Sequence, residues 1–174
     1  MKRNSWQEYQ KEVADDRYYY LRSCIRQNFF PGSEKAFVRI LRQELGRDLF
    51  DDPVHTSCTG IGYHSDIVPL ETIMTVVARQ FALASEAGYE NLAVSCITPF
   101  GIYTEILETW QEFPELEAKV REHLFRATGR EFRKPKNVSH ASDIIFHHRE
   151  AIRQRAAYLL VNRRTGEPLR GVEH

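Results

Sequence analysis

Cysteine is scarce in this 174-residue chain, which has three, and no apolar run approaches the length of a membrane span. An odd number of widely spaced cysteines argues against a disulfide scaffold and favours reduced thiols or a metal site. The apolar runs are far shorter than the ~20 residues that a bilayer-spanning helix needs. Internal repeats and low-complexity tracts are also absent. The length fits one domain with an adequate core.

A net charge of either sign is also missing, because 24 basic residues balance 24 acidic ones. This balance gives no reason to expect nucleic acid or an anionic membrane as a partner. The first residues, Met1 to Glu8, are polar and lack the apolar core of a signal peptide. We therefore expect the protein in the cytoplasm, without a membrane span.

Predicted strands and helices alternate along the sequence. Apolar or aromatic stretches predict strands at residues 18–23 and 91–95, a short strand or turn at 48–50, and a last short strand at Val138. Apolar periodicity predicts helices over residues 5–16, 69–87 and 100–112. Capping residues help to delimit three more, from Ser33 as N-cap to Gly46, from Pro114 to Gly129, and from Ser139 as N-cap over roughly 140–160. Residues 53–67 are predicted to form a loop. The alternation predicts an α/β domain, with a three-layer, Rossmann-like, mostly parallel sheet and helices on both faces.

The three cysteines are the main candidates for chemistry. Cys24 and Cys96 each follow a predicted strand, and Cys58 lies on a loop that can reach them. Carboxyl ends of parallel strands share one edge of the sheet, so the thiols are expected to converge there. Thiolate suits zinc and iron–sulfur clusters, with Ser57, His55 or His64 as a further donor. The alternative is that each cysteine is a small buried hydrophobe.

A glycine-containing segment and a histidine are weaker candidates for a functional site. Gly60-x-Gly62-x-x-Ser65 has part of a dinucleotide-binding fingerprint, but no apolar strand precedes it, so a tight turn is the better interpretation. His140, at the start of the last predicted helix, can cap, bind a metal or donate a hydrogen bond, and a packed histidine is slightly favoured.

Three segments in order resemble the cysteine-rich "CCG" domain found in the B subunit of heterodisulfide reductase. Cys24-Ile-Arg-Gln-Asn-Phe-Phe-Pro-Gly32 is similar to the first element of that domain, Thr56-Ser-Cys-Thr-Gly-Ile-Gly62 to the second, and Cys96-Ile-Thr-Pro-Phe-Gly101 to the third. Thr128–Phe132 and Val138–Ile144 also resemble the family. The resemblance covers roughly residues 18–150. It implies a CCG-like α/β domain at 18–152, an N-terminal helical extension at 1–17, and a helix end and tail at 153–174.

The resemblance also implies a cofactor and partners. Members of this family use five cysteines to hold a non-cubane [4Fe–4S] cluster, and this chain retains Cys24, Cys58 and Cys96 as implied ligands. Ser57 replaces one cysteine of the pair, and Pro99, which cannot bind a metal, replaces another. Ser57, His64, His55 or a substrate thiol would complete the ligand set. Family members carry two such domains in one chain, and this sequence contains one.

These features lead to three hypotheses. The first is a redox-complex component similar to the B subunit of heterodisulfide reductase, an oxidoreductase subunit that holds an iron–sulfur cluster and takes part in electron transfer or thiol/disulfide chemistry. The second is a subunit without a cluster that has a structural or assembly role, with other reductase subunits or a second copy of the chain in a homodimer as its partner. The third is a zinc-binding CCG-like domain.

Overall fold

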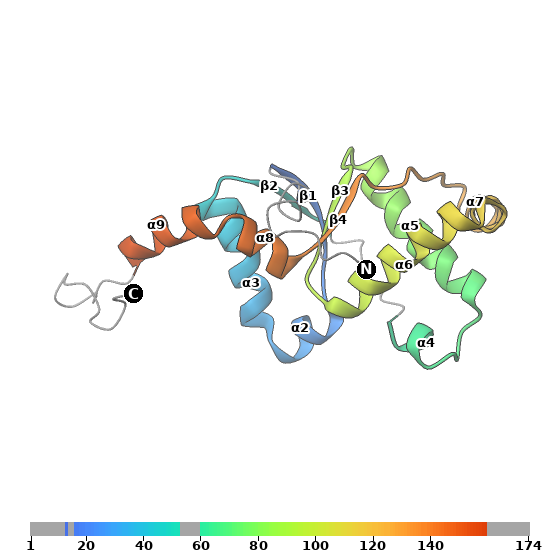
Figure 1. Cartoon of the computed structure of the whole chain (residues 1–174), viewed down its shortest axis with the longest axis horizontal. Coiled ribbons are helices and arrows are strands. Elements are labelled where there is room, and N and C mark those ends of the chain that lie inside the picture. The colour runs from blue at the N-terminus through green and yellow to red at the C-terminus, as the bar shows by residue number, and fades with distance from the viewer. Residues whose placement is uncertain (1–12, 14–15, 53–59, 160–174) are drawn as a thin grey trace.

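A four-stranded parallel sheet forms the centre of the protein (Figure 1). The computed structural model describes Val13 and residues 16–52 and 60–159. The strands are β1 (Arg17–Leu21), β2 (Asp48–Asp51), β3 (Asn91–Val94) and β4 (Asn137–His140), in the spatial order β2-β1-β3-β4. Leu21 pairs with Val94, and Val94 pairs with His140, so the last residues of these three strands lie side by side.

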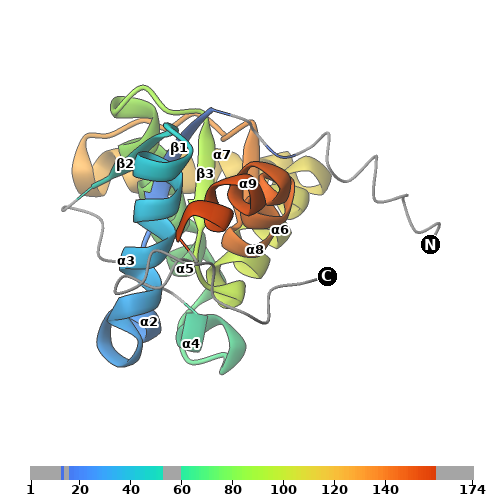
Figure 2. The ribbon, with the colours of Figure 1, turned by 90° about the vertical axis from the view of Figure 1, so that its left-hand side faces the viewer.

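Helices cover both faces of the sheet, as Figures 1 and 2 show from two directions. Alternate residues of β1 face opposite sides: Tyr19 and Leu21 belong to one buried cluster, and Tyr18 and Tyr20 to the other. The first cluster is completed by α5 (Leu70–Glu86), α6 (Ile97–Glu112) and α7 (Pro114–Thr128), and the second by α3 (Pro31–Arg39), the π-helical turn η1 (Ile40–Glu44) and α8 (Ala141–His147). The predicted three-layer α/β architecture is confirmed.

The helices with clear start and stop residues lie where the sequence predicts them. Helix α7 begins at Pro114, whose missing N–H costs nothing in a first turn. It ends at Gly129, which has a φ of 70° in the left-handed region that glycine adopts without strain. Helix α5 likewise fills most of the predicted 69–87.

The segment after β1 differs from the prediction. A short helix, α2 (Cys24–Phe29), directly follows the strand, and the Ser23 hydroxyl accepts a hydrogen bond from the Arg26 backbone N–H at 3.2 Å. Helix α3 then begins at Pro31, so Ser33 lies inside its first turn and is not the N-cap. The Ser33 hydroxyl instead donates to the Phe30 carbonyl at 2.8 Å. This six-residue helix has no buried residues, so the sequence contains no apolar periodicity from which the helix could be predicted.

Two other predictions need correction. Ser139 lies in β4, so His140 is the N-cap of the last helical region, and that region divides into α8 and α9 (Arg149–Leu159) at His148. The predicted loop at 53–67 contains a short helix, α4 (Gly60–His64), in place of the tight turn expected at Gly60 and Gly62. Helix α6 also starts three residues early, with Pro99 tolerated in its first turn.

The predicted helix at 5–16 lies almost wholly outside the described residues. Within the described part of the chain, no helix combines the length and the apolar character that crossing a bilayer requires.

Candidate thiol site

The chain reverses its direction of travel across the sheet between β1 and β3. From β1 it passes to β2 on one side, and then crosses to β3 and β4 on the other. In open parallel sheets, ligands bind outside the carboxyl ends of the strands at such a reversal. The fold therefore identifies the ends of β1 and β3 as the first place to look for a site.

Cys24 and Cys96 occupy these two strand ends. Cys24 is the first residue of α2, three residues after Leu21, and its side chain is exposed. Cys96 is the N-cap of α6, two residues after Val94, and is half-buried. The Ser95 backbone N–H donates to the Leu21 carbonyl at 3.5 Å, so the pairing of the two strands continues up to the cysteines. Neither thiol has the fully buried setting of a packing cysteine.

A buried carboxylate ties the two strand ends together. Glu34, on α3, is only 7% exposed, and its Oε1 accepts hydrogen bonds from the Ser23 backbone N–H at 3.4 Å and from the Ser95 hydroxyl at 2.7 Å. Ser23 and Ser95 immediately precede Cys24 and Cys96. Glu34 therefore fixes the backbone from which both thiols project.

The other oxygen of this carboxylate has a partner of its own. Tyr20 donates its hydroxyl proton to Glu34 Oε2. Burial raises the pKa of the Tyr20 phenol well above its ordinary value, so the hydroxyl remains a donor at neutral pH. Sequence reasoning missed Glu34, although its position on the same helical face as Phe37 and Leu41 was a signal that the carboxylate points inward.

His140 ends β4 at the same edge. Its ring lies 5.9 Å from that of Phe100, one turn of α6 after Cys96. Its Nδ1 accepts the Ser142 backbone N–H at 3.3 Å and so caps α8. Burial lowers the pKa of His140, and Arg26 of α2 adds to that effect while Asp143 opposes it. A neutral ring that accepts at Nδ1 carries its proton on Nε2, so His140 is a capping residue with one hydrogen-bond donor left.

The remaining predicted site residues are not all described. Cys58, Ser57 and His55 lie outside the described residues, so the structure does not test whether the third thiol joins the other two. His64 is exposed on α4, where its ring contacts that of Tyr63. Tyr63 donates to Glu105 Oε2 at 2.6 Å and thereby holds α4 against α6.

The described part of the site is a partial fit to a metal or cluster. Two thiols at neighbouring strand ends, one exposed and one half-buried, provide soft ligands that solvent or a cofactor can reach. Within residues 16–52 and 60–159, however, no three His, Cys, Asp or Glu side chains form a group able to hold a metal ion. A complete ligand set therefore requires at least one residue outside this described part of the chain.

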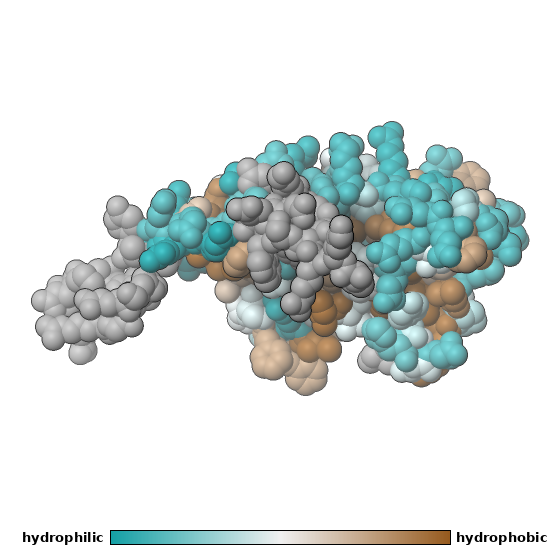
Figure 3. Space-filling model, viewed as in Figure 1, coloured by the Kyte–Doolittle hydropathy of each residue, from teal (hydrophilic) through white to brown (hydrophobic). Residues whose placement is uncertain are grey.

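Exposed apolar side chains lie on the same elements as the two thiols. They belong to Ile25, Phe29 and Phe30 of the α2 region and to Ile97 at the start of α6, with exposed fractions of 51%, 74%, 63% and 65%. We call these four residues the apolar edge. Figure 3 shows apolar surface gathered at the lower margin of the molecule, over α2. Large apolar side chains in water beside a candidate site are typical of a surface that contacts another molecule.

The fold and the strand-end thiols define a class: a parallel α/β domain with two solvent-accessible cysteines at its topological switch point. A curated protein is similar to the chain in sequence. The B subunit of the ferredoxin:CoB-CoM heterodisulfide reductase of Methanosarcina acetivorans is 27% identical across 83% of this chain. The alignment covers 48% of the relative, so the chain spans about half the length of the curated protein it matches.

Structural similarity supports the fold alone. A hypothetical protein from Helicobacter pylori, known from its crystal structure, superposes with a TM-score of 0.57 at 16% identity, over 83% of this chain and 31% of that one. No family model matches the chain. The comparisons thus relate the chain to a subunit of a redox complex.

Proposed function

We propose that this chain is a redox-complex component similar to the B subunit of heterodisulfide reductase. In this proposal Cys24, Cys58 and Cys96 bind an iron–sulfur cluster, and Ser57, His64, His55 or a substrate thiol completes the ligand set. The cluster, when bound, supplies electron transfer or thiol/disulfide chemistry. The supporting observation is the position of Cys24 and Cys96 at the ends of the two strands that flank the switch point.

The residues around the thiols have distinct roles in this proposal. Glu34 keeps the two strand ends at a fixed separation through Ser23 and Ser95, which suits a rigid ligand set. The apolar edge meets another subunit of the complex and keeps water from the thiols. This partner is proposed because the relative is named as one subunit of a reductase and is about twice as long as the aligned segment.

Metal analysis of the full chain tests the proposal. Purified without oxygen, the protein is expected to contain about four iron and four sulfide per chain and to give the electronic and EPR spectra of a cluster. A zinc site would give about one zinc per chain and no such spectra. Separate Cys24→Ala, Cys58→Ala and Cys96→Ala variants should each lose most of the metal.

Further variants identify the remaining donor. Ser57→Ala and His64→Ala should differ, with the larger loss of metal at the true ligand, and His123→Ala provides a matched control because His123 is exposed on α7. A chain that contains no iron, or whose iron content survives Cys58→Ala, would contradict the proposal.

A second candidate is a subunit without a cluster that has an assembly role in such a complex. The apolar edge favours it, since four exposed apolar side chains give a docking surface whether or not the thiols bind metal. This candidate predicts a metal-free chain that forms a defined complex with iron–sulfur subunits identified by mass spectrometry. A metal-free chain that stays monomeric in their presence would exclude it.

A further inference from the structure

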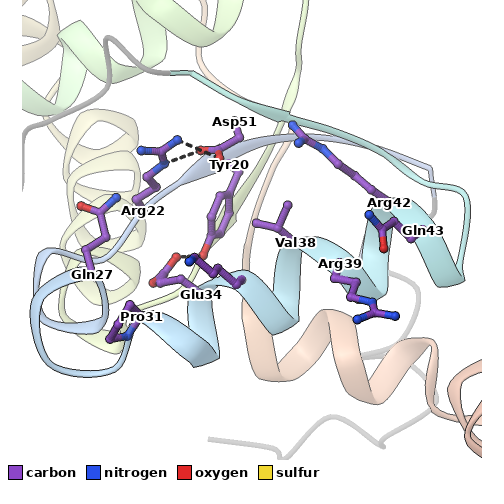
Figure 4. Close-up of a pocket in the computed structure, with 11 residues that line it drawn as sticks. Tyr20, Arg22, Gln27, Pro31, Glu34, Val38, Arg39, Arg42, Gln43 and Asp51 are labelled. Atoms are coloured by element: carbon purple, nitrogen blue, oxygen red, sulfur yellow. Dashed lines mark hydrogen bonds and ion pairs between the residues drawn. The ribbon is translucent and has the colours of Figure 1, made fainter. Parts of the chain in front are cut away.

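The structure contains a second concave site, on the α3 side of the sheet. A pocket of about 520 Å³ lies between α3, η1 and the carboxyl ends of β1 and β2 (Figure 4). Small-molecule sites typically occupy about 300–1,000 Å³, so the pocket is large enough for a metabolite. Neither Cys24 nor Cys96 lines it, although Tyr20 and Glu34 of the candidate thiol site do.

The carboxylates of this pocket already have partners. Asp51 accepts two hydrogen bonds from Arg22, at 2.5 and 2.8 Å, in a bidentate pair. Glu34 accepts from Tyr20 and Ser95 and faces the strand ends. Both negative charges of the pocket wall are therefore engaged within the protein.

Two basic side chains of the pocket wall, Lys35 and Arg42, form no ion pair with these carboxylates. In the described part of the chain, Lys35 forms no ion pair or hydrogen bond, and Arg42 donates only through Nε, to the Leu49 carbonyl at 2.7 Å. The terminal nitrogens of the Arg42 guanidinium remain available as donors. Figure 4 shows Arg42 reaching from η1 toward β2 on the same side of the pocket as Asp51. Basic groups that line a concavity and form no ion pair within it can recognise carboxylate or phosphate.

The rest of the lining suits an organic molecule. The Tyr20 ring and Val38 stand in the middle of the pocket between the charged groups (Figure 4). Val38 offers apolar surface to a carbon skeleton, whereas the Tyr20 ring, at 1% exposed, offers almost none. Inorganic phosphate alone would leave most of the volume unfilled.

We propose that this pocket binds a small organic anion, with Lys35 and Arg42 of its wall supplying the positive charge and Val38 contacting its carbon skeleton. The proposal does not rest on the proposed function, because neither cysteine lines the pocket, although Tyr20 and Glu34 belong to both sites.

Calorimetric titration of the full chain tests this site with citrate, with glucose 6-phosphate and with glucose. At least one of the two anions should bind, and glucose should not. Binding of citrate alone would identify a carboxylate ligand, binding of glucose 6-phosphate alone would identify a phosphate ligand, and both outcomes support the site. The absence of binding by both anions at millimolar concentration, or equal binding of glucose, would overturn it.

Charge-removing variants locate the binding. Lys35→Gln and Arg42→Gln should each raise the dissociation constant of the anion about tenfold, which is the effect of losing one charge-assisted hydrogen bond. Arg126→Gln is the matched control, since it removes the same charge from the exposed surface of α7. Lys35 has no partner among the described residues, so its variant should fold normally even if Arg42→Gln does not. Equal weakening by Arg126→Gln, or none by Lys35→Gln, would overturn the proposal.

Discussion

Glu34 is the residue on which the geometry of the candidate thiol site depends most. Its carboxylate receives hydrogen bonds from three groups at the ends of two strands, although the side chain is almost completely buried. A buried acceptor with several donors stabilises the fold mainly because its removal leaves those donors unsatisfied. Stability and thiol position are therefore coupled at this one side chain.

We expect Glu34→Ala to lower the free energy of unfolding by about 2–4 kcal/mol, since the Tyr20 and Ser95 hydroxyls would lose their buried acceptor. Denaturant unfolding measures this change. The strand ends should also loosen, so iodoacetamide should label Cys24 and Cys96 faster in the variant.

Glu122→Ala is the control for this change. Glu122 is exposed on α7 and pairs with Arg126 at 3.7 Å, so its removal should cost less than about 1 kcal/mol and leave labelling unchanged. Equal stability of the two variants would show that Glu34 does not connect the strand ends.

Single residues of the site could be predicted only where their chemical type was distinctive. Cys24 and Cys96 were found because cysteines that follow strands are unusual, and the structure locates both at the switch point. Glu34 was missed because an acidic residue in a first helical turn usually interacts with solvent and the helix dipole. Its place on the face of Phe37 and Leu41 indicates that it points inward, but its hydrogen-bond partners Tyr20 and Ser95 come from distant strand ends and cannot be read from the helix alone.

At the scale of elements, the start of α8 shows how one residue ends a strand and begins a helix. His140 pairs with Val94 in the sheet, and its ring accepts the Ser142 N–H of the first helical turn. The cap needs an unprotonated Nδ1, and burial lowers the pKa of His140 in the direction that keeps the ring neutral.

Because the folded-state pKa of His140 lies below the unfolded value, the unfolded chain binds the proton more readily. The contribution of His140 to stability is therefore present above the unfolded pKa of about 6.5 and is lost as the pH falls through the folded pKa. We expect His140→Ala to cost about 1 kcal/mol at pH 7.5 through loss of the cap. Thermal unfolding at several pH values measures both effects.

His140→Asn separates the cap from the titration. Asparagine is a good N-cap that does not titrate, so this variant should keep the stability of the wild type at pH 7.5 and lose less of it between pH 6.5 and pH 5. An identical decline in the wild type and the His140→Asn variant would show that other groups cause the pH dependence.

Helices could be predicted where the apolar periodicity and the residues that end a helix indicated the same boundaries. Helices α5 and α7 combine a long apolar stripe with a terminal glycine, and both were predicted nearly to their ends. The errors concern short elements. α2 and α4 have only six and five residues, too few to show a period, and the break at His148 separates α8 from α9 without proline or glycine.

At the scale of the whole molecule, the chain combines a well-packed three-layer core with an unusually apolar surface at one edge. The relative from Methanosarcina acetivorans is about twice as long as the segment it shares with this chain. The four side chains of the apolar edge are a candidate surface for contact with another molecule. The sequence could not predict this surface, because Phe29 and Phe30 have the residue types of a core.

Phe29→Ser combined with Phe30→Ser tests whether these side chains serve association and not folding. Both are already mostly in water, so the double variant should change the free energy of unfolding by less than about 0.5 kcal/mol. It should, however, abolish the binding of a partner subunit or of a second copy, whichever sedimentation velocity detects with the wild type. Phe125→Ser is the control, because Phe125 is also exposed but lies on α7. A large loss of stability in the double variant would mean that the two rings support the fold, and association that survives it would exclude the apolar edge as the contact surface.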